Sequence, residues 1–470
     1  MQLWLEWFKC ALVFRKACTR GRTFGWLVFA LIGFSTLPDL SGVTGLARAA
    51  HLKRKFYHNF LHLFHSSALS LPLLTRTWIL LVPKLFRPVL FRERPVVLLD
   101  GIKIAKEGKK MPGVKKLHQE SANNSKAPYI FGHSLQVLAL LVQSLTGQLF
   151  AISLISRIHE GITLSSQDKT SYFQKVHSLI AALTGPTFQK ILLVADAFYP
   201  NRVVILPLLE KGHHLLSKVR PTSVAFEPPP PEPCKNGRKG RKRKYGKKVV
   251  LAKLWKNRRD FQTKKIAIYG KGAMDVPFLP INLIWKPIKM MVRFILVDHP
   301  EKGKMILIST DLEMPPEEAI QIYCARFKIE VSFKFSIHTI GAYAYKFWMK
   351  LWKPNKRREG DQDLSQKPEH YRKKALAKIE AYHRFIQLGI IGQGLLLHLA
   401  INFKKVVWRE FPTWLRVMNF NRVPSEWVVA ETLKFLLPGF LVGKTIGLSL
   451  RKFMADKIDV AKIWRMNISA

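Results

Sequence analysis

The 470-residue sequence predicts an α/β protein, in which a mixed sheet is flanked by helices and carries a β-strand insertion. Short apolar runs alternate with helical patterns across residues 91–219, which is typical of a layered α/β core. A proline run and a dense basic stretch interrupt this pattern before further strands follow. Residues 1–90 and 346–470 are mainly helical and basic, so we expect a helical region at each end.

Residues 1–90 are predicted to form a helical DNA-binding domain. The segment 41–67 has the pattern of two short helices around a turn near His51. The second helix would expose a basic face that includes Arg54 and Lys55, as in helices that read DNA. A basic surface helix without a DNA partner would show the same pattern.

The first part of the predicted core covers residues 91–219. Its longest apolar stretch, Ser134–Ser156, is uncharged and long enough to suggest a membrane span. Thr146-Gly147 interrupts this stretch with a turn signal, so we predict two strands instead. The other expected elements are a strand at 95–100, a helix at 170–183, a strand at 191–196, a helix at 201–212 and a strand at 213–219.

Residues 220–302 are predicted to form a basic, β-rich insertion, with strands at 265–270, 277–285 and 289–297. Its Phe226–Lys248 segment joins a proline run to a basic loop, which excludes a regular core element. We expect this loop to contact the DNA backbone because its charge density is high; a solvated linker is the alternative. The expected contact residues are Arg238, Lys239, Arg241, Lys242, Arg243 and Lys244.

Residues 303–345 are predicted to complete the core with a strand at 304–311 and a helix from about Pro315. In the following region, Phe385–Phe403 approaches the length of a membrane span but carries several glycines and polar residues. We therefore expect no membrane partner, and a basic membrane protein is kept as the least favoured alternative. The four cysteines form no zinc-type spacing and no cleavable signal peptide is predicted, which favours the cytoplasm.

Acidic residues are scarce, because 31 Asp and Glu face 77 Lys and Arg and the formal net charge is +46. Such an excess favours a polyanionic partner. Asp100 and Asp196 are each predicted at the C-terminal end of an apolar strand, the edge at which ligands bind in open α/β sheets. A turn or helix N-cap aspartate would occupy the same place in the sequence.

A third carboxylate lies in "YCARFKIEVSFK", residues 323–334. Tyr323, Arg326, Glu330 and Lys334 would share one face of a predicted helix. This pattern suits either a salt-bridge ladder or a phosphate site beside a cation. Four other acids compete for the third metal position, namely Asp311, Glu313, Glu317 and Glu318.

Together, Asp100, Asp196 and Glu330 with "YCARFKIEVSFK" resemble the DDE transposases of bacterial insertion sequences. The resemblance covers about residues 90–345 and implies a ribonuclease-H-like core with a β-rich insertion before the last acid. One position departs from the family signature: the lysine usually found seven residues after the glutamate is Ile337 here. Lys334 or His338 would have to take its place.

The resemblance implies a cut-and-paste transposase that cleaves and joins DNA strands at the ends of a mobile element. Asp100, Asp196 and Glu330 would hold Mg²⁺, or Mn²⁺ in its place, while Tyr323, Arg326 and Lys334 would orient phosphates. Carboxylate oxygens suit Mg²⁺, and a pair of such ions can activate an attacking oxygen and stabilise a leaving one. The implied partner is double-stranded DNA, bound by a homodimer in the bacterial nucleoid. A decayed transposase that binds DNA without catalysis is the main alternative.

Overall fold

The structure is a computed structural model of the 470-residue chain. It describes residues 1–36, 39–119, 127–164, 170–185, 187–230, 243–268, 272–354, 360–414, 418–443 and 447–459. All structural statements below refer to these residues.

The core sheet has the strand order β6-β5-β3-β8-β9. Its strands are β3 (Arg94–Ala105), β5 (Tyr129–Gln143), β6 (Leu149–Ile158), β8 (Leu192–Ala195) and β9 (His214–Val219). β5 pairs antiparallel with both β6 and β3, whereas β3, β8 and β9 run parallel to one another. This mixed order is that of a ribonuclease-H-like sheet, so the predicted fold class is confirmed.

The predicted break at Thr146-Gly147 is also confirmed, because β5 and β6 form an antiparallel hairpin around it. Gly147 has a φ of 80°, which glycine adopts without strain. The stretch that was long enough to span a membrane is therefore two buried strands at the centre and edge of the core sheet.

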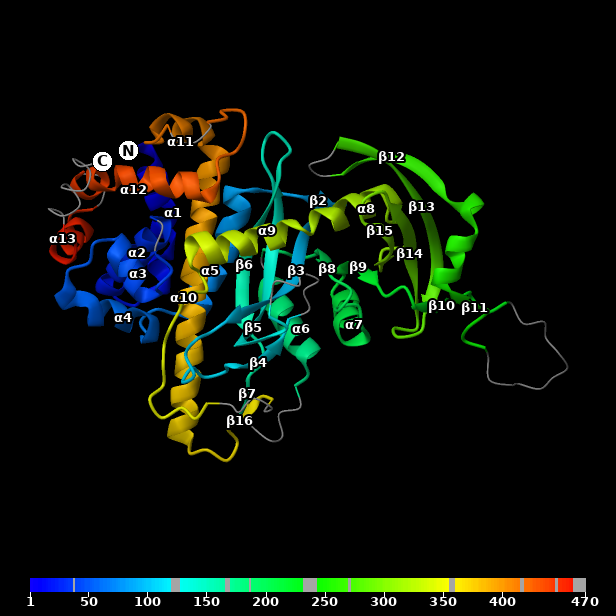
Figure 1. Ribbon diagram of the computed structural model, residues 1–470, viewed down its shortest axis with the longest axis horizontal. Helices are drawn as coiled ribbons and strands as arrows, with labels where there is room; N and C mark the ends of the chain where they lie inside the picture. The colour runs from blue at the N-terminus through cyan, green and yellow to red at the C-terminus, as the bar shows by residue number, and fades with distance from the viewer. Residues whose placement is uncertain are drawn as a thin grey trace.

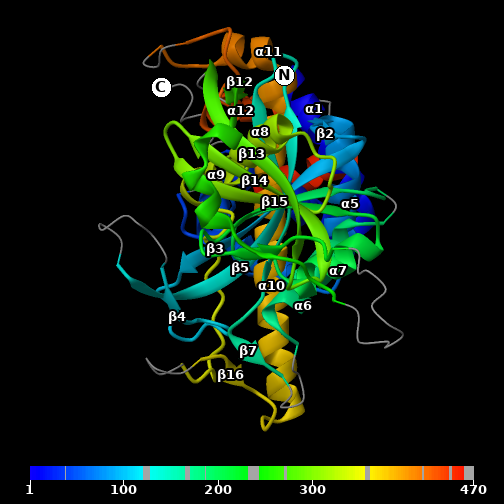
Figure 2. The ribbon, with the colours of Figure 1, turned by 90° about the vertical axis from the view of Figure 1, so that its right-hand side faces the viewer.

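Helices cover both faces of this sheet (Figures 1 and 2). On one face lie α6 (Tyr172–Leu183) and α7 (Arg202–Glu210), which begin at the side-chain caps Ser171 and Asn201. On the other face lies α9 (Lys328–Phe335), preceded by α8 (Pro316–Ala325) and followed by the π-helical turn η5 (Ser336–Ile340). The helices expected at 170–183, 201–212 and from Pro315 are thus present.

The predicted insertion strands extend the core sheet, because β15 pairs antiparallel with β9. Beyond it follow β14, β13, and then β10 and β12, which form a curved sheet at the right of Figure 1. α8 packs against β12, and Gln321 donates to the Ala267 carbonyl at 3.3 Å. The bounds are β10 (Val224–Phe226), β11 (Lys248–Val250), β12 (Gln262–Ile268), β13 (Gly272–Trp285), β14 (Met290–His299) and β15 (Gly303–Ser309), with short 3₁₀ turns at Leu251–Lys256 and Arg258–Asp260.

The N-terminal region is helical, as predicted, and contains the two short helices expected around His51. Its elements are α1 (Gln2–Leu12), α2 (Gly21–Ser35), α3 (Val43–Ala49), α4 (Tyr57–His65) and α5 (Leu71–Leu85), with 3₁₀ turns η1 (Val13–Ala17) and η2 (Arg54–Phe56). The C-terminal helices pack onto them, and the two ends of the described chain lie together in Figure 1. A bridge between Leu52 and Ile458 joins the two regions.

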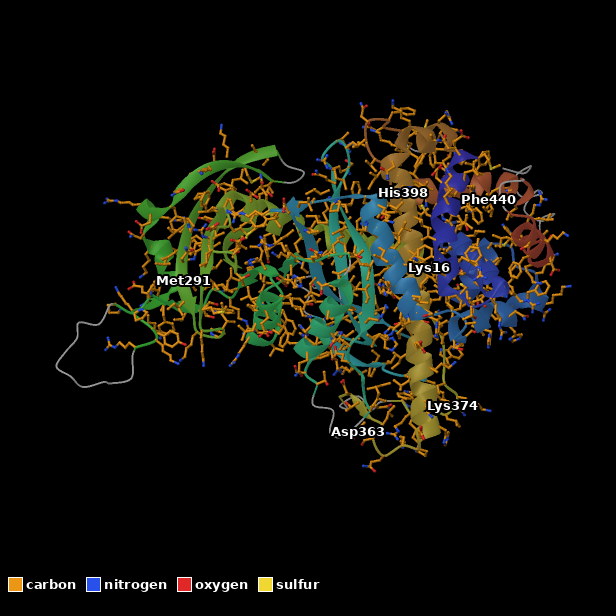
Figure 3. All side chains as sticks on the ribbon, turned by 180° about the vertical axis from the view of Figure 1, so that it is seen from behind. Lys16, Met291, Asp363, Lys374, His398 and Phe440 are labelled. Carbon is orange, nitrogen blue, oxygen red and sulfur yellow. The ribbon has the colours of Figure 1, made fainter. Side chains whose placement is uncertain are left out.

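The C-terminal helices are α10 (Glu369–Asn402), α11 (Lys404–Glu410), α12 (Glu426–Val442) and α13 (Leu448–Lys457). α10 is long and apolar enough to cross a membrane, but 89% of its apolar window is buried inside the protein. In Figure 3 it runs from Lys374 at its exposed end to His398 beside the N-terminal helices. A Cβ on Gly394 would lie 2.2 Å from the Trp78 ring, so the glycines of this helix permit close packing.

Short strands complete the structure. They are β1 (Arg87–Pro88), β2 (Leu90–Phe91), β4 (Lys115–His118), β7 (Ile162–Thr163) and β16 (Gln362–Asp363). β1 and β4 pair with β5, β2 pairs with β3, and β7 pairs with β16. The last pair ties the loop before α10 to the end of the core sheet.

Candidate active site

Asp100 lies in the middle of β3 and not at its end, so that part of the prediction was wrong. β3 continues to Ala105 because β5 remains its partner up to the pair Ala105 and Gly132. Its other neighbour, β8, pairs only as far as Leu99. Asp100 therefore marks the point at which the parallel side of the sheet opens, which leaves its carboxylate accessible from that side.

Asp196 directly follows β8, as predicted. Leu99 pairs with Ala195 in parallel register, so Asp100 and Asp196 are the next residues on strands that lie about 4.8 Å apart. Ser217 Oγ donates to the Asp196 carbonyl at 3.0 Å and holds this backbone in place. Within the described residues, no hydrogen bond or ion pair reaches the Asp196 carboxylate.

The segment around Glu330 is not one helix, which corrects the sequence prediction. α8 ends at Ala325 and α9 begins at Lys328. Through the junction the backbone bonds tighten to three-residue spacing: Arg326 N–H donates to the Tyr323 carbonyl at 3.1 Å and Glu330 N–H donates to the Phe327 carbonyl at 3.1 Å. Arg326 lies in this junction, between Tyr323 on α8 and Glu330 on α9.

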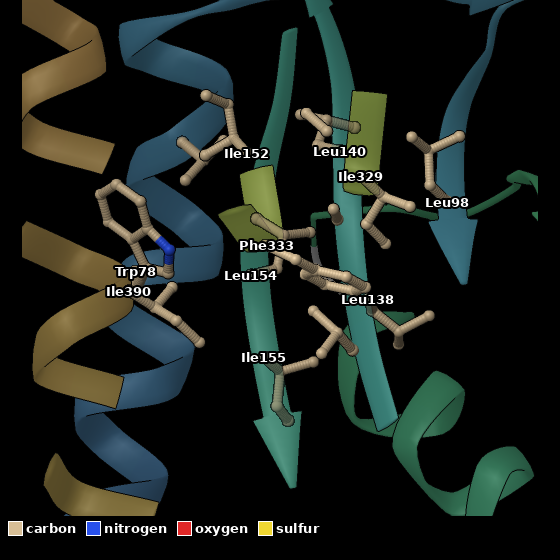
Figure 4. Packing of buried hydrophobic residues seen from close by; sticks show 14 of the residues in the cluster. Trp78, Leu98, Leu138, Leu140, Ile152, Leu154, Ile155, Ile329, Phe333 and Ile390 are labelled. Atoms are coloured by element: carbon tan, nitrogen blue, oxygen red, sulfur yellow. The ribbon is translucent and has the colours of Figure 1, made fainter. Parts of the chain in front are cut away.

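The inner side of α9 is anchored in the core. Ile329 and Phe333 are buried, and Figure 4 shows them over β3, β5 and β6 among Leu98, Leu138 and Leu140. Glu330 lies beside these residues in the first turn of α9, with 43% of its side chain exposed. The apolar packing of α9 therefore fixes the position of the third carboxylate.

Arg326 joins two of the three acids. Its Nη1 donates to Asp100 Oδ2 at 2.7 Å and its Nη2 donates to Glu330 Oε1 at 2.9 Å. The guanidinium also lies over the Tyr323 ring, 6.0 Å from its centroid. Burial by itself would lower the pKa of Arg326, but Asp100, Tyr323, Asp196 and Glu330 together raise it above its ordinary value.

The carboxylates remain incompletely neutralised. Burial raises the pKa of Asp100 to about 6, although Arg326 and the Gly101 N–H lower it, and the charges of Glu330 and Asp196 raise it further. Burial also raises the pKa of Tyr323 above its ordinary value, with Asp196 and Asp100 acting in the same direction. The structure thus brings Asp100, Asp196, Glu330, Arg326 and Tyr323 into one electrostatic unit.

Divalent cations would compete with Arg326 for the carboxylate oxygens of this unit. In the described parts of the chain, no group of three or more His, Cys, Asp or Glu side chains is arranged to hold a metal ion as it stands. The donor set nevertheless fits a hard cation, because it consists of carboxylate oxygens from β3, β8 and α9. Asp196 has no counter-charge in direct contact, and Asp100 keeps a raised pKa even beside Arg326.

Among the described residues, no hydrogen bond or ion pair joins the remaining candidates near Glu330 to this unit. Lys334 is exposed in the last turn of α9. Asp311 lies 3.6 Å from Arg92 and 3.7 Å from Arg94, and Glu313 lies 3.2 Å from Arg92. Glu317 is paired with Lys264, and Glu318 is exposed in the first turn of α8.

Three residues that support Asp100 were missed by the sequence prediction. Gln136 lies opposite Gly101 on β5, accepts from the Tyr199 hydroxyl at 2.6 Å, and donates to the Tyr172 hydroxyl. The signal was present as one glutamine within the otherwise apolar run 135–142 of β5. Tyr199 N–H donates to the Asp196 carbonyl at 3.1 Å, so the same network supports both aspartates.

The DNA-contact residues predicted outside the Glu330 segment lie far from the three carboxylates along the chain. Arg54 and Lys55 are exposed, but they lie in the 3₁₀ turn before α4 and not on the helix itself, which corrects that part of the prediction. Arg243 and Lys244 are exposed at the end of the basic loop. The other four residues predicted in that loop, Arg238, Lys239, Arg241 and Lys242, lie outside the described residues.

Comparison with protein families gives one match, to a family described as DDE superfamily endonuclease, over residues 13–269. This range is more than half of the chain and includes Asp100 and Asp196, but it ends before Glu330. No curated protein matches the chain. Members of this superfamily generally use divalent metal ions.

Proposed function

Because the chain belongs to the DDE superfamily of endonucleases, we propose that it is a transposase that cuts and joins DNA at the ends of a mobile element. The observation that carries this proposal is the convergence of Asp100 and Glu330 on one guanidinium, with Asp196 at the adjacent strand end. In phosphodiester cleavage, the carboxylates can bind metal ions and the guanidinium can bind a phosphate oxygen.

In this proposal, Asp100, Asp196 and Glu330 hold divalent ions, with Mg²⁺ as the expected species and Mn²⁺ as its substitute. When bound, such ions supply Lewis-acid activation of an attacking water or 3′-hydroxyl and stabilise the leaving oxygen. Arg326 neutralises the acids in the metal-free protein and grips a phosphate oxygen of the bound strand. Tyr323 keeps its proton because its pKa is raised, so it can donate a hydrogen bond to the same phosphate.

The partner in this proposal is double-stranded DNA carrying the element's terminal inverted repeats, bound by a homodimer in the bacterial cytoplasm. Arg54 and Lys55 would contact one part of the repeat, and the basic loop from Arg238 to Lys244 would contact the backbone. Both sites lie on exposed parts of the chain where described, and the net charge of +46 favours such a partner.

Ile337 favours one alternative, a decayed transposase that binds DNA without cutting it. Its side chain lines a hollow beside the Glu330 helix, where the family signature usually has a lysine. Such a protein would keep the basic surfaces but would not need the acids.

Glu330→Gln separates these two functions. The change keeps the size of the side chain and one hydrogen-bond acceptor for Arg326, but it removes a carboxylate from the proposed metal site. We expect binding to DNA with the element's termini to stay within about twofold, while Mg²⁺-dependent cleavage falls by roughly a thousandfold or more. Gel-shift titration and a cleavage assay on the same DNA measure the two quantities.

Glu318→Gln is the matched control, because Glu318 is an exposed acid on the preceding helix and should retain full cleavage. Cleavage by the Glu330→Gln protein at the wild-type rate would reject Glu330 as a catalytic residue. A wild-type protein that binds the termini but never cleaves them would favour the decayed transposase.

A further inference from the structure

A hollow of about 420 Å³ opens beside the end of β3. We call it the lysine pocket and define it by Lys106, Ile337, Tyr345, Lys346 and Trp348, which all line it. Lys346 and Trp348 are exposed at its rim, Lys106 is half-buried, and Tyr345 is buried beneath. Two cationic side chains and an accessible aromatic ring therefore share one concave surface.

Two hydrogen bonds and one aromatic ring hold the ammonium group of Lys106 in place. Its Nζ donates to the Tyr343 carbonyl at 2.5 Å and to the Tyr345 carbonyl at 3.1 Å. The same Nζ lies 3.5 Å from the centroid of the Tyr345 ring. An ammonium group has three N–H donors; two are taken by the carbonyls, and the third can face the Tyr345 ring or an anion in the pocket.

The floor of the pocket is also preorganised. His133 Nε2 lies 3.0 Å from the Pro112 carbonyl, which can only accept, so this nitrogen carries the proton. His133 Nδ1 must then accept from the Tyr345 hydroxyl, 2.7 Å away. The Tyr345 ring stacks on Tyr382 at a centroid distance of 4.7 Å, and it cannot move without breaking both contacts.

The positive charge of the pocket lacks a buried counter-ion. Glu107 also lines the pocket and lies 3.8 Å from Lys346, but its side chain is 95% exposed, so water screens this pair. Burial, together with the charge of Lys346, lowers the pKa of Lys106 to about 7, and no described acid offsets this effect. A partly buried cation without a partner is unfavourable, and an anion in the pocket would compensate it.

The pocket adjoins the proposed active site through two elements. Ile337 follows Glu330 by seven residues, which is about 10 Å along a helix. Lys106 follows Asp100 by six residues, which is about 20 Å along β3. One DNA strand advances about 3.4 Å per phosphate along its axis, so these separations correspond to about three to six nucleotides.

We propose that the lysine pocket binds a backbone phosphate of the DNA strand that enters the active site, with Lys106 and Lys346 as its cationic ligands. This inference rests on the proposed function. Lys106, which follows β3, and Lys346, which follows η5, thereby supply the positive charge that Ile337 does not provide. Trp348 lies at the rim, where its exposed ring can contact the adjoining sugar or base.

The test uses Lys346→Gln in the full-length protein, because Lys346 is exposed and its loss should not affect folding. Lys350→Gln is the matched control, since Lys350 is an exposed lysine four residues away that does not line the pocket. Affinity for linear DNA with the element's termini is measured at several salt concentrations without divalent ions. We expect Lys346→Gln to weaken binding about three- to tenfold and to lower the slope of log affinity against log salt by about 0.9, with Lys350→Gln unchanged.

A second arm locates the phosphate. Each phosphate near the cleaved end is replaced in turn by an uncharged methylphosphonate, and both proteins are titrated with each DNA. We expect one replacement to weaken the wild-type protein about three- to tenfold but to leave the Lys346→Gln protein unaffected, because the two changes remove the same contact. Inorganic phosphate alone, measured by thermal shift against chloride at equal ionic strength, tests for a site for free phosphate.

The outcomes are distinguishable. In one outcome, the wild type binds DNA in a salt-dependent way while every methylphosphonate replacement weakens the wild type and the Lys346→Gln protein equally. That result would overturn the pocket proposal but not the proposed function. Stabilisation by inorganic phosphate that depends on Lys346, without coupling to any DNA position, would assign the pocket to a free phosphate and would also overturn it. Absence of DNA binding by the wild type would overturn both proposals.

Discussion

Arg326 donates to Asp100 and to Glu330 through two different nitrogens, so one guanidinium holds β3 and α9 together. Its side chain is 15% exposed, and that of Asp100 is 19% exposed, so the pair is only weakly screened by water. Removal of the arginine would leave two acids, with Asp196 nearby, as an uncompensated cluster. A divalent cation would then be the remaining counter-charge.

We therefore predict that Arg326→Ala lowers the stability of the metal-free protein by about 3 kcal/mol, the usual cost of breaking a largely buried pair from one side. Millimolar Mg²⁺ should restore part of the lost thermal stability, and should do so more strongly than in the wild type. Thermal unfolding with and without Mg²⁺ measures both effects. An unchanged Tm in the absence of metal would show that Arg326 does not balance these acids.

At the residue scale, the sequence predicted which acids lie together but not what joins them. Asp100, Asp196 and Glu330 could be recognised because acids are rare and two of them follow apolar runs. The position of Arg326 between them depends on the tightened backbone between α8 and α9, which helical spacing alone does not predict. Gln136 and Tyr199 support Asp100 from elements 35 or more residues away from it along the chain.

At the scale of the elements, a buried polar network links α9 to α10 and α12. Ser336 donates to Gln393, and Gln393 Nε2 donates to the Ser332 carbonyl at 3.1 Å and to Glu426 Oε1 at 3.3 Å. Lys328 of α9 lines the same hollow as Glu426. Because α9 carries Glu330, this network helps to set the height of the third carboxylate above the sheet.

Glu426 makes this network sensitive to pH. Burial raises the pKa of Glu426 from 4.5 to about 7 in the folded protein, although its own backbone N–H and Gln393 lower it. Protonated Glu426 therefore favours the folded protein. This contribution to stability is fully present below about pH 4.5 and is lost as the pH rises through about 7.

Glu426→Gln should remove this loss, because glutamine keeps the acceptor for Gln393 without a charge. We expect equal Tm values for the variant and the wild type near pH 4.5. At pH 8 the variant should be more stable by about 3 kcal/mol. Glu369→Gln, at an exposed acid, is the control and should show no such pH dependence. Parallel pH profiles of Tm for the wild type and Glu426→Gln would refute this assignment.

The elements themselves were largely predictable, because strand and helix patterns are local. The β5–β6 hairpin, β8, α6, α7 and β9 lie where apolar periodicity and turn residues indicated. The full length of β3 was not predicted, since residues 101–105 are held by pairing with β5 and not by their own apolar pattern. Likewise, the pairing of β15 with β9, which joins the insertion to the core sheet, connects segments about 90 residues apart.

At the scale of the whole molecule, the charge is distributed over a chain whose two ends pack together. Lys53 Nζ donates to the Asp456 carbonyl at 2.9 Å, and Lys457 Nζ lies 3.9 Å from the centroid of the Phe56 ring. The exposed Arg54 and Lys55 therefore lie on a surface built by both the N-terminal and the C-terminal helices. A DNA-binding role for this surface requires both ends of the chain.

The net charge of +46 predicts steep salt dependence if DNA is the partner. A protein that makes six to ten phosphate contacts loses roughly 10³- to 10⁵-fold in affinity between 50 and 200 mM salt. We expect a loss in this range, and we expect an Arg54→Ala, Lys55→Ala double variant to reduce the slope by up to about 2. Fluorescence anisotropy over a salt series measures both, and a nearly flat dependence would contradict the proposed partner.

The central claim is that Asp100, Asp196 and Glu330 bind the same divalent ions. Anomalous X-ray scattering from Mn²⁺ in crystals of the protein bound to DNA with the element's termini tests it most directly. We expect an anomalous peak coordinated by oxygens of all three carboxylates, with Arg326 turned to a phosphate. Manganese bound elsewhere, with Arg326 still bridging Asp100 and Glu330 in the DNA complex, would contradict it.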